Sequence, residues 1–142
     1  MSDLASLYQQ LILDHSKSPH GRQPLESPTA SSHQVNPTCG DEVTLDLEVR
    51  EDAIAAVGWT GHGCSISQAS ASLLAGLVEE KSVADARDLL EEFREAMRSR
   101  GAIELDEERF GDAIALNGVS KYVARVKCAM LPWVALEHAL AQ

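Results

Sequence analysis

The chain has 142 residues, of which 44% are hydrophobic and 24% charged, and its formal net charge is -10. This length and composition are typical of one folded domain, 1–142, with a hydrophobic core. The acidic balance disfavours nucleic acid and anionic membranes as partners, because both bind basic patches. There is no signal-peptide pattern and no apolar run that spans a bilayer, so the expected location is cytoplasmic.

The pattern of apolar residues predicts an α+β fold, in which helices pack on a small antiparallel sheet of three strands. An apolar stripe predicts a first helix over 3–15, and a loop rich in Pro and Ser follows at 22–32. Alternating residues predict the strands, and Glu51-Asp52 is the expected turn between the last two. The strands are expected at 33–35, 43–49 and 54–60.

The second half of the chain is predicted to be helical. Small apolar residues after Ser65 predict a closely packed helix, and Ser82 with Asp85 resembles the start of another, which Gly101 would end. A weaker helical segment is expected at 106–116. A final helix is expected to carry Ala129, Trp133, Leu136 and Leu140 on its apolar face.

The loop Asn36-Pro37-Thr38-Cys39-Gly40-Asp41 is the most informative stretch of the sequence. Pro37 and Gly40 exclude a helix here and favour a tight loop. Cys39 and Asp41 then point into one small volume, as a soft thiolate beside a hard carboxylate, and both are zinc ligands. Taken alone, the pair favours a buried cysteine beside a solvated aspartate over a metal site.

The other two cysteines also lie at special points of the backbone. Cys64 follows Gly61-His62-Gly63 and precedes a predicted helix, whose N-terminus favours a thiolate. Cys128 precedes Pro132 by four residues, so it is expected at a helix start or a kink. Together with Cys39 and Asp41 these residues favour a metal site over inert core thiols.

Three segments of the chain resemble the IscU/SufU family. They are Asn36 to Asp41, Gly61-His62-Gly63-Cys64-Ser65-Ile66-Ser67, and Arg125-Val126-Lys127-Cys128; the stretch Asp14-His15-Ser16-Lys17-Ser18-Pro19 is also similar to the family's start. Family members of the IscU type are scaffolds on which iron–sulfur clusters are assembled, and those of the SufU type are zinc-dependent sulfurtransferases. The resemblance implies a metal site at one exposed end of the fold.

Two features are similar to SufU rather than IscU. The residue before the third cysteine is Lys127 where scaffolds carry histidine, and the chain contains an extra segment around 88–112. A lysine ammonium has no lone pair for a metal. The resemblance therefore implies Zn²⁺ bound by Cys39, Asp41, Cys64 and Cys128.

The resemblance also implies a mechanism and two partners. A SufS-type cysteine desulfurase, which depends on pyridoxal phosphate, would present a persulfide, and one of its histidines would replace Cys39 on zinc. The freed Cys39 would accept the sulfur and pass it to a SufBCD-type iron–sulfur assembly complex. Arg125 would steady Asp41 or the persulfide, or would be an ordinary surface residue.

Several alternatives remain open on the sequence alone. The same four residues suit a [2Fe–2S] cluster on an assembly scaffold. A non-catalytic adaptor folded by zinc is a second alternative, whereas a metallohydrolase lacks the histidine motif that it needs. His62 is a weaker candidate ligand, and His15, His20, His33 and His138 are expected on the surface or in loops.

Overall fold

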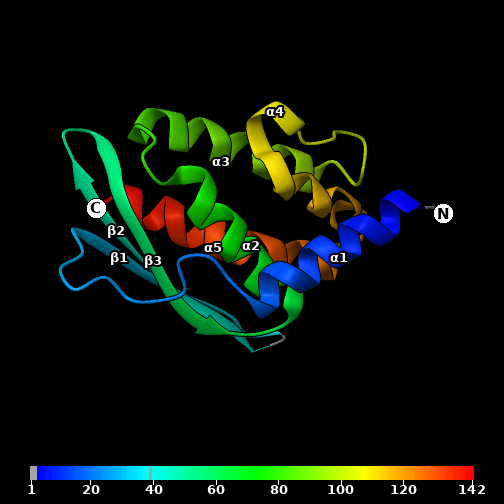
Figure 1. Cartoon of the computed structure of the whole chain (residues 1–142), viewed down its shortest axis with the longest axis horizontal. Helices are drawn as coiled ribbons and strands as arrows, with labels where there is room; N and C mark the ends of the chain where they lie inside the picture. Colours follow the sequence, from blue (N-terminus) through cyan, green and yellow to red (C-terminus); the bar gives the residue numbers. More distant parts are fainter. Residues whose placement is uncertain (1–2, 39) are drawn as a thin grey trace.

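The computed structural model describes residues 3–38 and 40–142, with an α+β architecture. Figure 1 shows three strands at one side of the molecule and the helices packed beside them. Along the chain the elements are α1 (Asp3–Lys17), β1 (Ala30–Asn36), β2 (Asp41–Arg50), β3 (Ala53–His62), α2 (Ser65–Val78), α3 (Val83–Arg98), α4 (Glu107–Phe110), the 3₁₀ helix η1 (Gly111–Lys121) and α5 (Val123–Leu140).

The sheet is antiparallel in the order β1-β2-β3, which confirms the predicted three strands. Each strand is longer than the alternation alone indicated. Glu51 and Asp52 form the β2–β3 turn, both with positive φ (50° and 63°), which suits the twist of a tight hairpin. At the other end Asn36 pairs with Asp41, so the β1–β2 hairpin places the start of β2 at the tip of the sheet.

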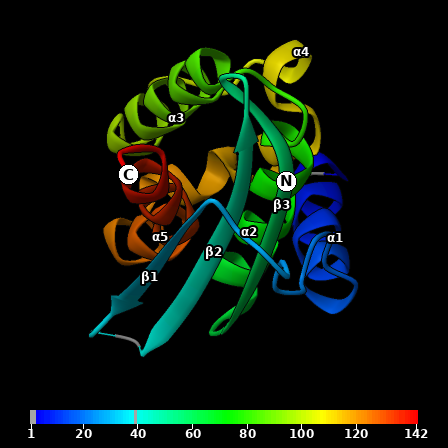
Figure 2. The same cartoon turned by 90° about the vertical axis from the view of Figure 1, so that its left-hand side faces the viewer.

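One face of the sheet packs on the helices. Leu45 and Leu47 of β2 and Trp59 of β3 are each 0% exposed. Figures 1 and 2 show α2 and α5 against this inner face, and α1 beside α2 at the edge of the molecule. The hydroxyl of Ser70 on α2 donates to the carbonyl of Ala129 on α5 at 2.6 Å, which ties these two helices together in the core.

The outer face of the sheet is only partly open to solvent. Asp46 alternates with the apolar residues of β2 and lies on this face, but it is only 8% exposed. The loop between α1 and β1 crosses the sheet here, and the backbone N–H of Leu25 in this loop donates to the Asp46 carboxylate. The hydroxyl of Ser31 on β1 donates to the same carboxylate. The loop leaves the end of the outer face nearest the β1–β2 tip uncovered.

The extra segment around 88–112 is part of the core. Phe93 of α3 stacks on Trp133 of α5 at 4.4 Å between ring centroids, and Phe110 lies against both rings. Ser82 caps α3 by accepting from the Asp85 N–H, as predicted. The predicted helix 106–116 is instead a single turn of α4 followed by η1, which continues past Asn117 and Gly118.

Candidate metal centre

Three of the four predicted ligands meet at the exposed tip of the sheet. One ligand atom from each of Asp41, Cys64 and Cys128 lies within 4.8 Å of the other two. Asp41 begins β2, Cys64 immediately precedes α2, and Cys128 lies on α5. Residues far apart in the sequence thus converge because the hairpin tip meets the facing ends of two helices.

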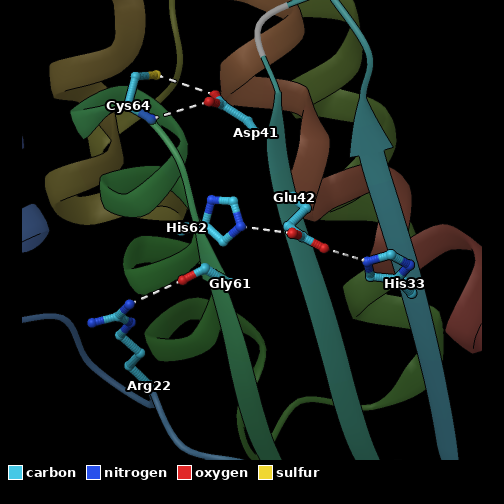
Figure 3. A network of polar contacts seen from close by, with 7 residues as sticks. All are labelled: Arg22, His33, Asp41, Glu42, Gly61, His62 and Cys64. Atoms are coloured by element: carbon cyan, nitrogen blue, oxygen red, sulfur yellow. Dashed lines mark hydrogen bonds and ion pairs between the residues drawn. The ribbon is translucent and has the colours of Figure 1, made fainter.

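Cys64 is the N-cap residue of α2, as its position after Gly63 predicted. Its backbone N–H donates to Oδ1 of Asp41 at 3.2 Å, and its Sγ lies 3.4 Å from Oδ2 (Figure 3). The Cys64 side chain is exposed, whereas Asp41 is 3% exposed. The site therefore pairs a buried carboxylate with a solvent-exposed thiol at a helix N-terminus.

Cys128 was expected at a helix start or a kink, and it does not lie at a helix start. Helix α5 begins five residues earlier, at Val123, and continues through Pro132. Tyr122 precedes the helix with extended backbone, and the helix then carries Cys128 inward, where it is 8% exposed. Pro132 has no N–H to donate to the Cys128 carbonyl, so the helix persists there without that hydrogen bond.

The electrostatics of the cluster fit a cation. Burial raises the pKa of Cys128 far above the ordinary thiol value, and the neighbouring Cys64 and Asp41 raise it further. Three potential anions in so small a volume repel one another unless a cation or protons neutralise them. Two thiolates with one carboxylate match the donors that zinc binds, and a fourth ligand would complete a tetrahedral site.

The fourth predicted ligand, Cys39, lies outside the described residues. Its neighbours are held by Asn36, whose side-chain Oδ1 accepts from the Thr38 N–H at 3.1 Å and whose carbonyl accepts from the Gly40 N–H at 2.8 Å. Because Cys39 is two residues from Asp41, chain length alone limits its Cα to within roughly 7 Å of the Asp41 Cα. A role for Cys39 at this site is therefore compatible with the connectivity.

A cavity of about 550 Å³ adjoins the cluster, and both Cys64 and Cys128 line it. Arg125 and Lys127, two side chains of α5, line the same cavity. The Arg125 guanidinium lies 5.1 Å from the centroid of the Tyr122 ring. Two basic residues thus line the cavity beside the thiols.

Gly63, expected only to precede Cys64 and the helix after it, also shapes the site. A Cβ at Gly63 would lie 2.6 Å from both Cγ and Oδ1 of Asp41 and 2.7 Å from the hydroxyl of Ser67. The missing side chain therefore lets the Asp41 carboxylate approach the Cys64 backbone. The signal was in the sequence, because a glycine next to a ligand permits a close backbone approach.

Gly63→Ala is expected to weaken zinc binding by at least about tenfold, because the added methyl group displaces the Asp41 carboxylate from Cys64. The measurement is competition with a zinc chelator of known affinity. Gly118→Ala is the matched control, because nothing lies within 4 Å of a Cβ at that position. Equal zinc affinity in Gly63→Ala and wild type would show that the Asp41 position does not matter to the metal.

His62 points away from the cluster. Its Nε2 lies 2.6 Å from Oε1 of Glu42, and Nε2 of His33 lies 2.8 Å from Oε2 of the same carboxylate (Figure 3). These hydrogen bonds, that of His33 foremost, lower the pKa of Glu42. The structure thus places His62 outside the group formed by Asp41, Cys64 and Cys128.

The remaining histidines lie elsewhere. His15 and His20 contact the hydroxyl of Ser72, through a ring nitrogen and a backbone N–H respectively. His138 is exposed on α5.

Within the described part of the chain, no helix has the length and hydropathy needed to cross a bilayer.

Comparison with known proteins finds a matching family model and similar proteins. Residues 7–129 match the model of the NifU-like N-terminal domain. The chain is 37% identical to the zinc-dependent sulfurtransferase SufU of Bacillus subtilis, covering 99% of this chain and 94% of that one. It is also 37% identical to the iron–sulfur cluster assembly scaffold protein IscU of Streptococcus pyogenes, covering 99% and 86%.

A solved structure agrees with these matches. The crystal structure of FiSufU from Fervidobacterium islandicum, described as an iron–sulfur cluster assembly scaffold protein for the SUF system, superposes with a TM-score of 0.79. The identity is 37%, and the match covers 95% of this chain and 97% of that one. With its α+β fold and its cluster of cysteine and aspartate side chains, the chain belongs to the IscU/SufU family of iron–sulfur cluster assembly proteins.

Proposed function

We propose that the chain is a zinc-dependent sulfurtransferase that accepts sulfur on Cys39 from a cysteine desulfurase and passes it to iron–sulfur cluster assembly. The observation that carries this proposal is the group formed by Asp41, Cys64 and Cys128. Cys39 precedes Asp41 by two residues in the sequence. Zinc bound by these four residues would keep the thiols deprotonated and protect them from oxidation.

Cys39 is the best acceptor of the three cysteines. Cys64 and Cys128 are each fixed to a helix, and Cys128 is buried. Cys39 belongs to the connection between two strands, where its neighbour Gly40 has a positive φ of 79°. A ligand from a short connection needs less rearrangement to leave a metal site than a ligand from a packed helix.

The transfer step is an exchange at a sulfur–sulfur bond. The Cys39 thiolate attacks the terminal sulfur of the desulfurase persulfide and forms a new S–S bond. The old S–S bond breaks, and the desulfurase cysteine leaves as a thiolate. Arg125 and Lys127, which line the adjoining cavity, would attract the anionic persulfide and hold it near the thiols.

A scaffold that holds a [2Fe–2S] cluster on the same residues is the second candidate, because thiolates suit both metals and both kinds of relative are similarly close. Lys127 favours sulfur transfer, since its exposed ammonium cannot serve as a ligand beside Cys128. The test combines metal analysis of freshly purified protein with sulfide release by a cognate desulfurase supplied with cysteine and a reductant. Stoichiometric zinc, no visible absorbance and stimulated sulfide release are expected; iron with visible absorbance and no stimulation would establish the scaffold.

Arg125→Ala is expected to slow sulfur transfer by about tenfold or more, since a charge-assisted contact to the anionic persulfide is lost. Zinc content should not change, because Arg125 is not a ligand. Arg98→Ala, which removes an exposed arginine of α3, is the matched control. Sulfide release is the measurement, and an Arg125→Ala rate equal to that of Arg98→Ala would mean that Arg125 is an ordinary surface residue.

A further inference from the structure

Two histidines and a glutamate form a second cluster of metal-ligating side chains on the outer face of the sheet. His33 lies on β1, Glu42 on β2 and His62 on β3, at the end of this face that the loop before β1 leaves uncovered. Figure 3 shows the Glu42 carboxylate between the two imidazole rings. The cluster plays no part in the sulfur transfer described above.

The sheet register brings the three residues together. Glu42 is directly opposite His62 in the β2–β3 pairing, and His33 lies diagonally across from Glu42 in the β1–β2 pairing. Diagonal neighbours on one face are within reach of long side chains. The side chains of His33, Glu42 and His62 are 53%, 37% and 70% exposed, so they have room to adjust around an ion.

The side-chain types match a divalent metal, but their present spacing does not. Among the described residues, the group with ligand atoms all within 4.8 Å of one another is Asp41, Cys64 and Cys128, so the exposed rings of His33 and His62 must turn to share an ion. Each carboxylate oxygen of Glu42 faces one Nε2 atom, at 2.8 Å for His33 and 2.6 Å for His62. In each of these hydrogen bonds the imidazole N–H donates to a carboxylate oxygen of Glu42. A neutral imidazole can carry its proton on Nδ1 instead, which frees the Nε2 lone pair for a metal. Imidazole and carboxylate are both ordinary zinc ligands.

We propose that His33, Glu42 and His62 form a second, exchangeable site for Zn²⁺ or a similar borderline divalent cation. The site is separate from the cysteine cluster because successive residues of a strand point to opposite faces. Asp41 points inward and is 3% exposed, whereas Glu42 points to the outer face. Three protein ligands leave the coordination shell open to water, so binding here is weaker than in a closed site with two or three thiolates.

The test uses the full chain already loaded with one equivalent of zinc and adds further Zn²⁺ during calorimetric titration. Wild type is expected to bind a second equivalent, and NMR should show the ring signals of His33 and His62 shifting with it. His33→Asn/His62→Asn should weaken this second binding by at least about tenfold, more than loss of an outer-sphere contact costs. The matched control is His138→Asn, which removes an exposed histidine of α5.

The same experiment separates this proposal from the proposed function. Cys128→Ser removes a ligand of the first site and should leave the binding at His33 and His62 unchanged. A second equivalent that binds equally well to the double histidine variant would overturn the proposal, as would shifts at the rings of other histidines alone. Since all three side chains are substantially exposed, the double variant is expected to fold, and circular dichroism checks this.

Discussion

Cys39→Ala should abolish the stimulation of sulfide release by the partner desulfurase, lowering the rate to that of the desulfurase alone. The reason is that the variant lacks the thiolate that attacks the persulfide, and no neighbouring side chain of the loop can replace a sulfur nucleophile. Sulfide release is the first measurement. The second is mass spectrometry of the chain after incubation with desulfurase and cysteine, where only wild type should carry added sulfur.

Thr38→Ala is the matched control for this experiment, because Thr38 is the exposed neighbour of Cys39. It should retain stimulation. Thermal unfolding of both variants separates the sulfurtransferase from an adaptor that zinc merely folds. An adaptor would lose function only in step with stability, whereas we expect Cys39→Ala to lose transfer even where it remains folded. Wild-type stimulation by Cys39→Ala would assign the acceptor to another cysteine.

Cys128→Ser should lose stoichiometric zinc and unfold at a lower temperature than wild type. A ligand present at a hundred times its Kd stabilises the folded state by about 2.7 kcal/mol, which corresponds to roughly 5–11 °C in Tm for a domain near this size. The measurements are metal content and thermal unfolding with and without a chelator. Chelation should lower the Tm of wild type and leave that of Cys128→Ser unchanged.

Zinc binding by wild type should also release protons. Because burial and the neighbouring Cys64 raise the pKa of Cys128, this thiol is protonated near neutral pH before metal binds. The proton must leave for a thiolate to form, so zinc affinity should rise with pH across the neutral range. Calorimetry in buffers of different ionisation enthalpy counts the protons, and Cys128→Ser should release fewer.

Glu42→Gln is the control for the loss of zinc from Cys128→Ser. It alters the residue next to Asp41 on the opposite face of β2, so it should keep the zinc at the cysteine cluster. If Cys128→Ser kept stoichiometric zinc and the wild-type Tm, the buried thiol would not be a ligand. The group formed by Asp41, Cys64 and Cys128 would then be a structural feature of the core.

Much of the fold could be predicted from periodicity and local backbone chemistry. Alternating residues around Leu45 gave β2, and the position of Cys64 after Gly63 gave the start of α2. These elements follow from interactions close in sequence. The single turn of α4 before η1 did not follow, because Phe110 is held there by rings of α3 and α5, which the local pattern does not contain.

The candidate site was predicted only in part, because local sequence features do not show which distant residues come together. Cysteine and aspartate at special backbone points, together with the family resemblance, indicated one cluster, and the structure brings Asp41, Cys64 and Cys128 together. The cluster of His33, Glu42 and His62 was not predicted. Its members become neighbours only through the strand register, which depends on both hairpin turns and does not appear in any one stretch of sequence.

The hydrogen bond from Ser70 to Ala129 has a consequence for the chemistry of the metal-free protein. It fixes α2 to α5 one residue from Cys128, so helix packing itself keeps the Cys64 and Cys128 sulfurs close together. If a peroxide oxidises the exposed Cys64 to a sulfenic acid, the adjacent thiol can condense with it and release water. We therefore expect demetallated protein treated with hydrogen peroxide to form a Cys64–Cys128 disulfide, and to accept zinc again only after reduction.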